Sequence, residues 1–197
     1  GWLDELDSIG SGNIDIMRGD IRDPQIVQQA ITGCDYVFHL SSLIAIPYSY
    51  VATKSYVDTN VMGTLNVLQA CRDLGTVKRI VHVSTSEVYG TAQQVPISEG
   101  HPLVAQSPYA ATKIGADKIA ESFVLSYGMP IVTARPFNIF GPRQTARAII
   151  PTIASQLLSG SIELQLGLLS PTRDFNFVLD TVRALILLIL CSEAEGK

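Results

Sequence analysis

Tyr109 and Lys113 lie four residues apart in the segment YAATK, a spacing that places both side chains on one face of a helix. An ammonium group close to a phenol favours the phenolate and lowers the pKa of the tyrosine. Such a tyrosine can take the proton of a hydroxyl group near neutral pH, which is the task of a general base in alcohol oxidation. The pair therefore predicts an enzyme that oxidises a hydroxyl group.

A second pair with the same spacing, Tyr50 and Lys54, is an internal control. It follows Pro47 in a predicted loop, and no hydroxyl-rich strand end precedes it. Tyr109, in contrast, opens a predicted helix downstream of STSEVYG (84–90). We interpret Tyr50 and Lys54 as structural residues or residues near the site entrance, and the later pair as catalytic.

Polar residues gather directly after three of the predicted strands, at 41–42, 84–87 and 137–138. In an open α/β sheet, ligands bind beyond the carboxyl ends of the strands. Three polar clusters at one edge of a sheet therefore predict a site there.

The elements that must position these residues alternate along the chain. Strands are expected at 14–18, 35–40, 79–84 and 131–135, and helices at 24–32, 57–74, 109–127, 149–159 and 181–190. This order predicts βαβ units and a parallel sheet with helices on both faces, a doubly wound α/β fold. The alternation weakens after residue 141, which predicts a larger domain over 1–141 and a smaller lobe over 142–197.

Composition excludes several other classes of protein. The formal net charge of -4 gives no electrostatic footprint for binding nucleic acid. The most apolar run, 184–191, is too short to span a bilayer, and no secretion signal opens the sequence. The three cysteines form no CxxC pair, so neither a disulfide framework nor a metal site is expected. A reducing cytoplasm is the expected compartment.

Six segments resemble, in order over nearly the whole chain, the extended short-chain dehydrogenases/reductases of the NAD-dependent epimerase/dehydratase family. They are GDIRD (19–23), HLSS (39–42), TNVMGTLNVLQA (59–70), STSEVYG (84–90), YAATK (109–113) and RPFNIFGPR (135–143). The resemblance implies an NAD(P)-binding, Rossmann-like domain over 1–141 and part of a substrate-binding lobe over 142–197. It also implies a nucleotide-sugar substrate and a homodimer formed through the two long helices.

The resemblance implies contacts with an NAD cofactor for one set of residues: Asp20, Ile21, Leu40, Ser41, Ser42, Asn60, Tyr109, Lys113 and Phe137. The first two would hold the adenine, and the stretch 40–42 would line the pyrophosphate and ribose, where the family usually has Ala-Ala. Lys113 would bond the nicotinamide ribose, and Phe137 would lie near the nicotinamide.

A second set would contact the substrate: Thr85, Asn138, Arg143 and Arg173. The last three match positions that meet the nucleotide diphosphate. Two arginines suit a diphosphate because each guanidinium offers a fork of donors.

The residues after the third predicted strand, Thr85, Ser86 and Glu87, limit the reactions that are expected of this site. They resemble the corresponding residues of 4,6-dehydratases and UDP-glucuronate decarboxylases. In the dTDP-glucose branch the middle residue is an Asp that donates a proton, whereas the GDP-mannose dehydratases share Ser86. Longer stretches, among them LSPTRDFNFV (169–178), resemble 4,6-dehydratases of the legionaminic-acid pathway.

The sequence therefore predicts a 4,6-dehydratase acting on UDP- or GDP-N-acetylglucosamine to give a 4-keto-6-deoxy sugar. A UDP-glucuronate decarboxylase, a 4-epimerase and a non-catalytic cofactor-binding relative are the alternatives.

The family begins with a strand and a Gly-rich turn that cradles the cofactor pyrophosphate. The run Gly10-Ser11-Gly12 has no predicted strand before it and is interpreted as a loop. We therefore expect the 197-residue chain by itself to lack that turn and the end of the substrate lobe, to bind NAD poorly and to be inactive.

Overall fold

Three parallel strands form the sheet that carries the site: β1 (Tyr36–His39), β2 (Arg79–Val83) and β3 (Ile131–Ala134). They are adjacent in the order β1-β2-β3, with Tyr36 opposite Arg79 and Ile80 opposite Ile131. The computed structural model describes residues 14–197, so the predicted loop at 10–12 lies outside the described residues. The parallel sheet confirms the predicted fold class.

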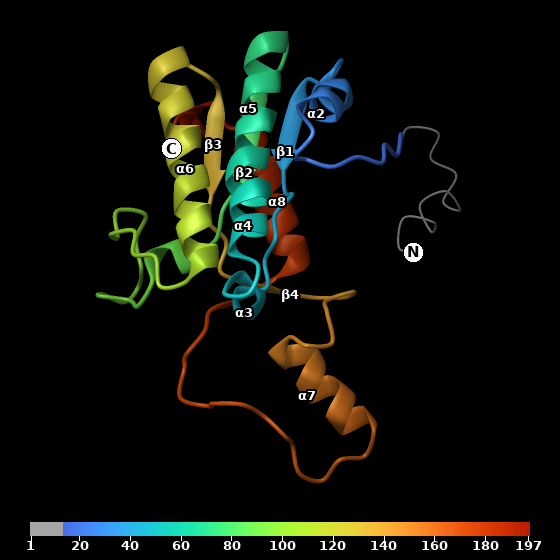
Figure 1. Cartoon of the computed structure of the whole chain (residues 1–197). Coiled ribbons are helices and arrows are strands. Elements are labelled where there is room, and N and C mark those ends of the chain that lie inside the picture. Colours follow the sequence, from blue (N-terminus) through green and yellow to red (C-terminus); the bar gives the residue numbers. More distant parts are fainter. Residues whose placement is uncertain (1–13) are drawn as a thin grey trace.

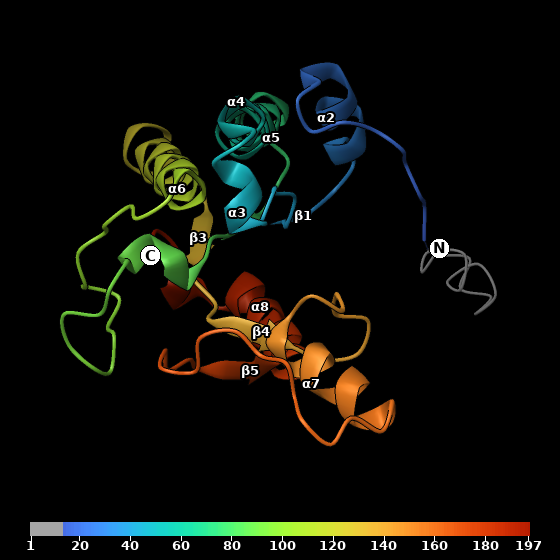
Figure 2. The same cartoon turned by 60° about the horizontal axis from the view of Figure 1, so that its bottom comes forward.

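Helices cover both faces of this sheet (Figures 1 and 2). One face is covered by α2 (Pro24–Ile31), α5 (Gly63–Leu74) and α6 (Pro108–Tyr127), and the opposite face by α8 (Val178–Leu190). The positions at which two of these helices, α2 and α6, begin follow from their capping residues. Asp23 accepts hydrogen bonds from two backbone N–H groups of α2, and Ser107 accepts one from Ala110 in α6, each before a Pro in the first turn.

Short elements connect these parts. A continuous helical stretch runs from α4 (Thr53–Tyr56) through the π-helix η1 (Val57–Met62) into α5, and α3 (Ile46–Ser49) precedes it. A 3-10 helix, η2 (Ser86–Tyr89), follows β2, and another, η3 (Ser192–Ala194), follows α8.

Beyond the sheet, β4 (Asn138–Phe140) and β5 (Phe175–Phe177) form a separate parallel pair, and α7 (Ile149–Leu158) stands away from the main sheet (Figure 1).

The predicted strand at 14–18 is wrong, since residues 14–20 have no regular structure. Ile14, Ile16 and Met17 are exposed, and no strand of the described chain pairs with their backbone groups. The pair β4–β5 was not predicted, because three-residue strands are too short to show a period.

The main core lies between the sheet and the helices α2, α5 and α6, with Leu68, Ile80, Ala120 and Ile131 among its buried members. We expect Leu68→Ala to destabilise the protein by about 2–5 kcal/mol, because Leu68 is 0% exposed and its removal leaves a cavity. Leu125→Ala is the matched control, since Leu125 is 80% exposed. Urea unfolding measures both, and equal losses would contradict this placement of the core.

Candidate active site

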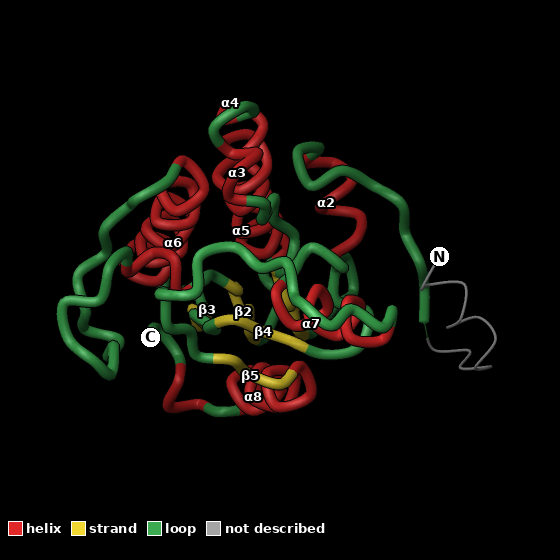
Figure 3. Tube along the Cα trace, turned by 90° about the horizontal axis from the view of Figure 1, so that it is seen from below, coloured by secondary structure: helices red, strands yellow, loops and turns green. Residues whose placement is uncertain are grey.

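The segments that follow β2 and β3 lie side by side at the carboxyl edge of the sheet, which Figure 3 views from below. The backbone N–H of Ser84 donates to the carbonyl of Ala134 at 2.7 Å, and that of Ser86 donates to the carbonyl of Pro136 at 3.1 Å. The ladder between the two strands thus continues past their ends. It brings the predicted cluster at 84–87 next to the one at 137–138.

Thr85 is the N-cap of η2, and its hydroxyl oxygen accepts a hydrogen bond from the N–H of Glu87 at 3.3 Å. The same hydroxyl lies near the phenol of Tyr109, close enough to influence its pKa. The Tyr109 ring is buried and meets the ring of Tyr56 edge-on, with 6.3 Å between centroids. Tyr56 is itself fixed by donating to the carbonyl of Ala45 at 2.6 Å. The structure therefore brings Thr85, Glu87 and Tyr109 together on rigid elements.

The pKa directions of the predicted catalytic pair differ from the expectation. Burial raises the pKa of Tyr109 above its ordinary value; the Thr85 hydrogen bond opposes this, and the negative charge of Glu87 reinforces it. The net direction is upward, opposite to the lowering that the spacing of Tyr109 and Lys113 predicted. The ammonium group of Lys113 donates to the carbonyl of Val83 at 2.8 Å, and burial lowers its own pKa to about 8.

Asn60 connects the loop after β1 to the catalytic helix. It lies in the π-helix η1, where the N–H of Gly63 reaches the carbonyl of Asp58 five residues back. The Asn60 side-chain oxygen accepts from the Ser42 hydroxyl at 3.0 Å and from the Leu43 N–H at 2.8 Å. Its amide donates to the carbonyl of Leu43 and to the hydroxyl of Thr112 in α6. Asn60 thus holds the predicted cofactor loop at a set distance from α6.

We expect Asn60→Ala to destabilise the protein by more than about 2 kcal/mol, because each buried polar group left without a partner costs about 1–3 kcal/mol. Asn66→Ala is the control, since the partly buried Asn66 makes one side-chain hydrogen bond, to the carbonyl of Ile21 at 3.0 Å. Thermal unfolding of both variants measures the difference. A loss for Asn60→Ala no larger than for Asn66→Ala would remove Asn60 from this role.

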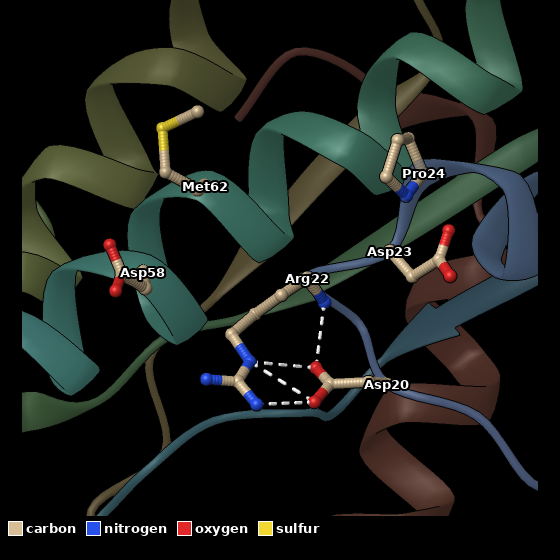
Figure 4. Close-up of a pocket in the computed structure, with 6 residues that line it drawn as sticks. All are labelled: Asp20, Arg22, Asp23, Pro24, Asp58 and Met62. Atoms are coloured by element: carbon tan, nitrogen blue, oxygen red, sulfur yellow. Dashed lines mark hydrogen bonds and ion pairs between the residues drawn. The ribbon is translucent and has the colours of Figure 1, made fainter.

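Asp20, one of the two residues predicted to hold the adenine, lines an open hollow of about 600 Å³ between the start of α2 and η1 (Figure 4). The guanidinium of Arg22 donates hydrogen bonds to both carboxylate oxygens of Asp20, with Nε 2.9 Å from Oδ1 and Nη2 2.5 Å from Oδ2. These hydrogen bonds lower the pKa of Asp20 to about 2. The opposite wall carries Asp58 and Met62.

A second hollow adjoins the first and is lined by Asp20, Ile21 and Ser41, among others. The structure therefore brings together two cofactor segments that the sequence separates by twenty residues. The lack of a side chain at Gly63 permits this, because a Cβ there would lie 2.9 Å from a methyl carbon of Ile21. Leu40, Ser41 and part of Ser42 remain accessible at this edge.

Three of the four predicted substrate residues, all except Thr85, lie at or near the pair β4–β5. The backbone N–H of Asn138 donates to the carbonyl of Asp174 at 3.1 Å, which places the exposed Arg173 one residue from that bond. Phe137 is half-buried just before β4. Arg143 lies in the exposed turn after β4, with a φ of 70° in the left-handed region. Asn138 and Arg173 therefore lie close together, and Arg143 follows within one turn.

Sequence reasoning missed a buried charged cluster made by His82, Asp117 and Arg135. The Asp117 carboxylate is 3.0 Å from His82 Nε2 and 2.9 Å from Arg135 Nε. One signal was present in the sequence, because Asp117 lies four residues after Lys113 and so shares its buried helix face.

Within residues 14–197, no group of three His, Cys, Asp or Glu side chains is placed to hold a metal ion. No helix in the same range combines the length and the apolar character needed to cross a membrane.

Known proteins of similar sequence are nucleotide-sugar enzymes. A dTDP-glucose 4,6-dehydratase from an Actinoplanes strain is 36% identical over 173 residues, which cover 87% of this chain and 53% of that protein. The crystal structure of a dTDP-glucose 4,6-dehydratase mutant from Streptomyces venezuelae, with NAD bound, superimposes with a TM-score of 0.89 at 30% identity. That match covers all of this chain and 60% of the solved one.

A UDP-N-acetylglucosamine 4-epimerase from Methanobrevibacter ruminantium, solved with UDP-N-acetylmuramic acid, is 33% identical with a TM-score of 0.84. That match covers 92% of this chain and 58% of the solved one. The chain thus spans little more than half the length of the relatives it matches. The family model described as GDP-mannose 4,6 dehydratase matches residues 1–196. These matches confirm the resemblance drawn from the motifs, and the chain belongs to the GDP-mannose 4,6 dehydratase family.

Proposed function

We propose that the whole protein is an NAD-dependent nucleotide-sugar 4,6-dehydratase. One observation carries this proposal: Thr85 at the start of η2 and Glu87 within it both lie close enough to the Tyr109 phenol to shift its pKa, so an alcohol base and a second acid/base lie at one site. The dehydratases among the relatives support it. The accessible segments around Asp20 and Ser41 fit a dinucleotide, since they line adjoining hollows at the strand ends.

Each of the proposed catalytic residues has its own role in the reaction. Tyr109 takes the proton of the sugar C4 hydroxyl, and Thr85 bonds and orients the same oxygen. NAD, when bound, accepts the C4 hydride and later returns it to C6. Glu87 removes the C5 proton, which the new 4-ketone has made acidic, as the C6 oxygen departs in water. The protons taken from O4 and C5 balance the one that leaves in water and the one that C5 regains. The hydride taken from C4 would be returned at C6, so the cycle is redox-neutral.

The substrate is the finer part of the proposal. We infer a UDP- or GDP-activated N-acetylglucosamine, with Arg143 and Arg173 on the diphosphate and Asn138 beside them. Two similarities support this substrate. Some stretches of the sequence resemble dehydratases of N-acetylated sugars, and the structure is similar to that of an epimerase of UDP-N-acetylglucosamine. Ser86 in place of an acid separates the site from the dTDP-glucose branch as the motif resemblance describes it. The homodimer through the two long helices remains a prediction.

Mass spectrometry of the products made by the whole protein tests both parts. The protein is incubated with NAD and, in separate reactions, UDP-N-acetylglucosamine, GDP-N-acetylglucosamine and dTDP-glucose. Loss of one water from an N-acetylglucosamine substrate is the expected result. A product of unchanged mass would instead identify an epimerase. Release of carbon dioxide from UDP-glucuronate would identify a decarboxylase. Conversion of dTDP-glucose alone would overturn the proposed substrate and leave the reaction standing.

A further inference from the structure

A buried carboxylate, Asp117, lies beneath the proposed catalytic residues. It is four residues after Lys113 on α6, and its side chain is 2% exposed. It accepts from Nε2 of His82, in the middle strand of the sheet, at 3.0 Å. It also accepts from Nε of Arg135, the residue after β3, at 2.9 Å. Asp117 therefore joins the catalytic helix to both strands whose ends carry the site.

Arg135 continues this connection to the segment that bears Glu87. Its guanidinium lies over the ring of Tyr89, 5.6 Å from the centroid, with Nη1 3.5 Å from the Tyr89 hydroxyl. Tyr89 is buried and is the last residue of η2, two positions after Glu87. A chain of contacts thus runs from Asp117, one helical turn after Lys113, through Arg135 and Tyr89 to the short helix that carries the proposed C5 base.

The two histidines that face this cluster contribute no positive charge at neutral pH. Burial lowers the pKa of His39 to about 3, and burial lowers the pKa of His82 despite its bond to Asp117. His82 therefore donates through Nε2–H. Its Nδ1 makes no hydrogen bond within the described residues, as fits an unprotonated ring nitrogen.

Asp117 itself is ionised. Burial raises its pKa, but the hydrogen bonds it accepts, that from His82 first, outweigh burial and hold the pKa below its ordinary value. Lys113 and Asp117 lie one helical turn apart on the same buried face of α6 and bond neighbouring residues of β2, since Lys113 donates to the carbonyl of Val83 and Asp117 accepts from His82. The other charged or titratable groups in this part of the site are Tyr109, Glu87 and Arg135. Among these groups, Asp117 is the one whose charge favours the ammonium form of Lys113.

We propose that Asp117 and Arg135 are positioning residues of the catalytic centre. Asp117 is the buried counter-ion that keeps Lys113 an ammonium, and Arg135 fixes Asp117 against the turn that carries Glu87. Burial disfavours a lysine charge, and a buried charge persists when an opposite charge is paired with it. Lys113 is only 3% exposed, so solvent cannot replace Asp117. The inference rests on the proposed function for its catalytic meaning, although the charge coupling is measurable without turnover.

The test is a pH titration of Lys113 in the whole protein by NMR, with lysines carrying ¹³C at Cε and the signal assigned by its absence in Lys113→Arg. In Asp117→Asn, which keeps the shape and loses the charge, we expect the titration midpoint to fall by about 1–3 pH units. Glu121→Gln is the matched control. It removes one carboxylate from the same helix, where the exposed Glu121 pairs with Lys118 at 2.5 Å. This control should leave the midpoint in place.

An unchanged midpoint in Asp117→Asn would overturn the proposal. Where that variant does not fold, Asp117→Asn/Arg135→Gln removes both charges and leaves no unpaired arginine, and the midpoint should still fall.

In parallel, the alkaline limb of the pH profile for cofactor reduction should move to lower pH in Asp117→Asn. A purely structural defect would instead lower the rate equally at every pH, which would also contradict the proposal. Failure of the dehydratase function would appear separately, as a wild-type protein that makes no 6-deoxy product while the NMR shift persists.

Discussion

Replacing Tyr109 by Phe in the whole protein is expected to abolish reduction of the bound cofactor, with a loss of about 10²–10⁴-fold in turnover. The substitution removes the phenolic oxygen that takes the proton of the C4 hydroxyl and keeps the ring that packs against Tyr56. Hydride cannot leave C4 unless that proton also leaves, so the first step fails. Absorbance of the reduced nicotinamide after mixing with substrate measures it directly.

Tyr50→Phe is the matched control for this variant. Tyr50 is 61% exposed, and its hydroxyl makes a long hydrogen bond of 3.3 Å to the carbonyl of Gln106. Its sequence partner Lys54 forms an ion pair with Asp58 instead. We therefore expect a mild effect at Tyr50. A Tyr109→Phe variant that kept more than about a tenth of wild-type turnover would be incompatible with loss of a general base.

Glu87→Gln is expected to separate the two halves of the reaction. The Glu87 carboxylate acts only after the ketone has formed, so the variant should still reduce bound NAD when it meets substrate. It should then release little 6-deoxy product, with an expected loss of about 10²–10⁴-fold in product formation. Stopped-flow absorbance records the first half, and mass spectrometry of the product records the second.

Glu99→Gln is the comparison for Glu87→Gln, because Glu99 is an exposed carboxylate in the loop that follows η2. That variant should form product at the wild-type rate. Normal product formation by Glu87→Gln would leave the dehydratase proposal without its C5 base and would favour an epimerase.

The long periodic elements could be predicted from the sequence, and the short ones could not. The helix α6 begins and ends within one residue of its predicted bounds, because Ser107, Pro108 and Gly128 mark its ends chemically. The three parallel strands were also found, since each is a short run in which apolar residues predominate. The segment 14–18 has the same apolar character and failed, because pairing with a neighbour decides whether such a run becomes a strand.

The electrostatics of the site were the least predictable part. The spacing of Tyr109 and Lys113 indicated the correct helix face, but the direction of the Tyr109 pKa depends on burial, which spacing does not show. Asp117 reads in the sequence as an ordinary polar residue of a helix. Only the packed structure shows that His82, Lys113 and Arg135 surround it.

The π-helix at Val57–Met62 has a consequence for how this sequence can change over evolution or in engineering. A π-turn holds one residue more than an α-helical turn, and such turns are found mostly at functional sites. Deleting one residue here would restore ordinary α-helical hydrogen bonding, yet it would rotate everything on its N-terminal side by about 100° relative to α5. Asn60 would then turn away from Leu43 and Thr112, which it now joins. Single-residue insertions and deletions should therefore be tolerated in the exposed loops of this protein and selected against in this one turn.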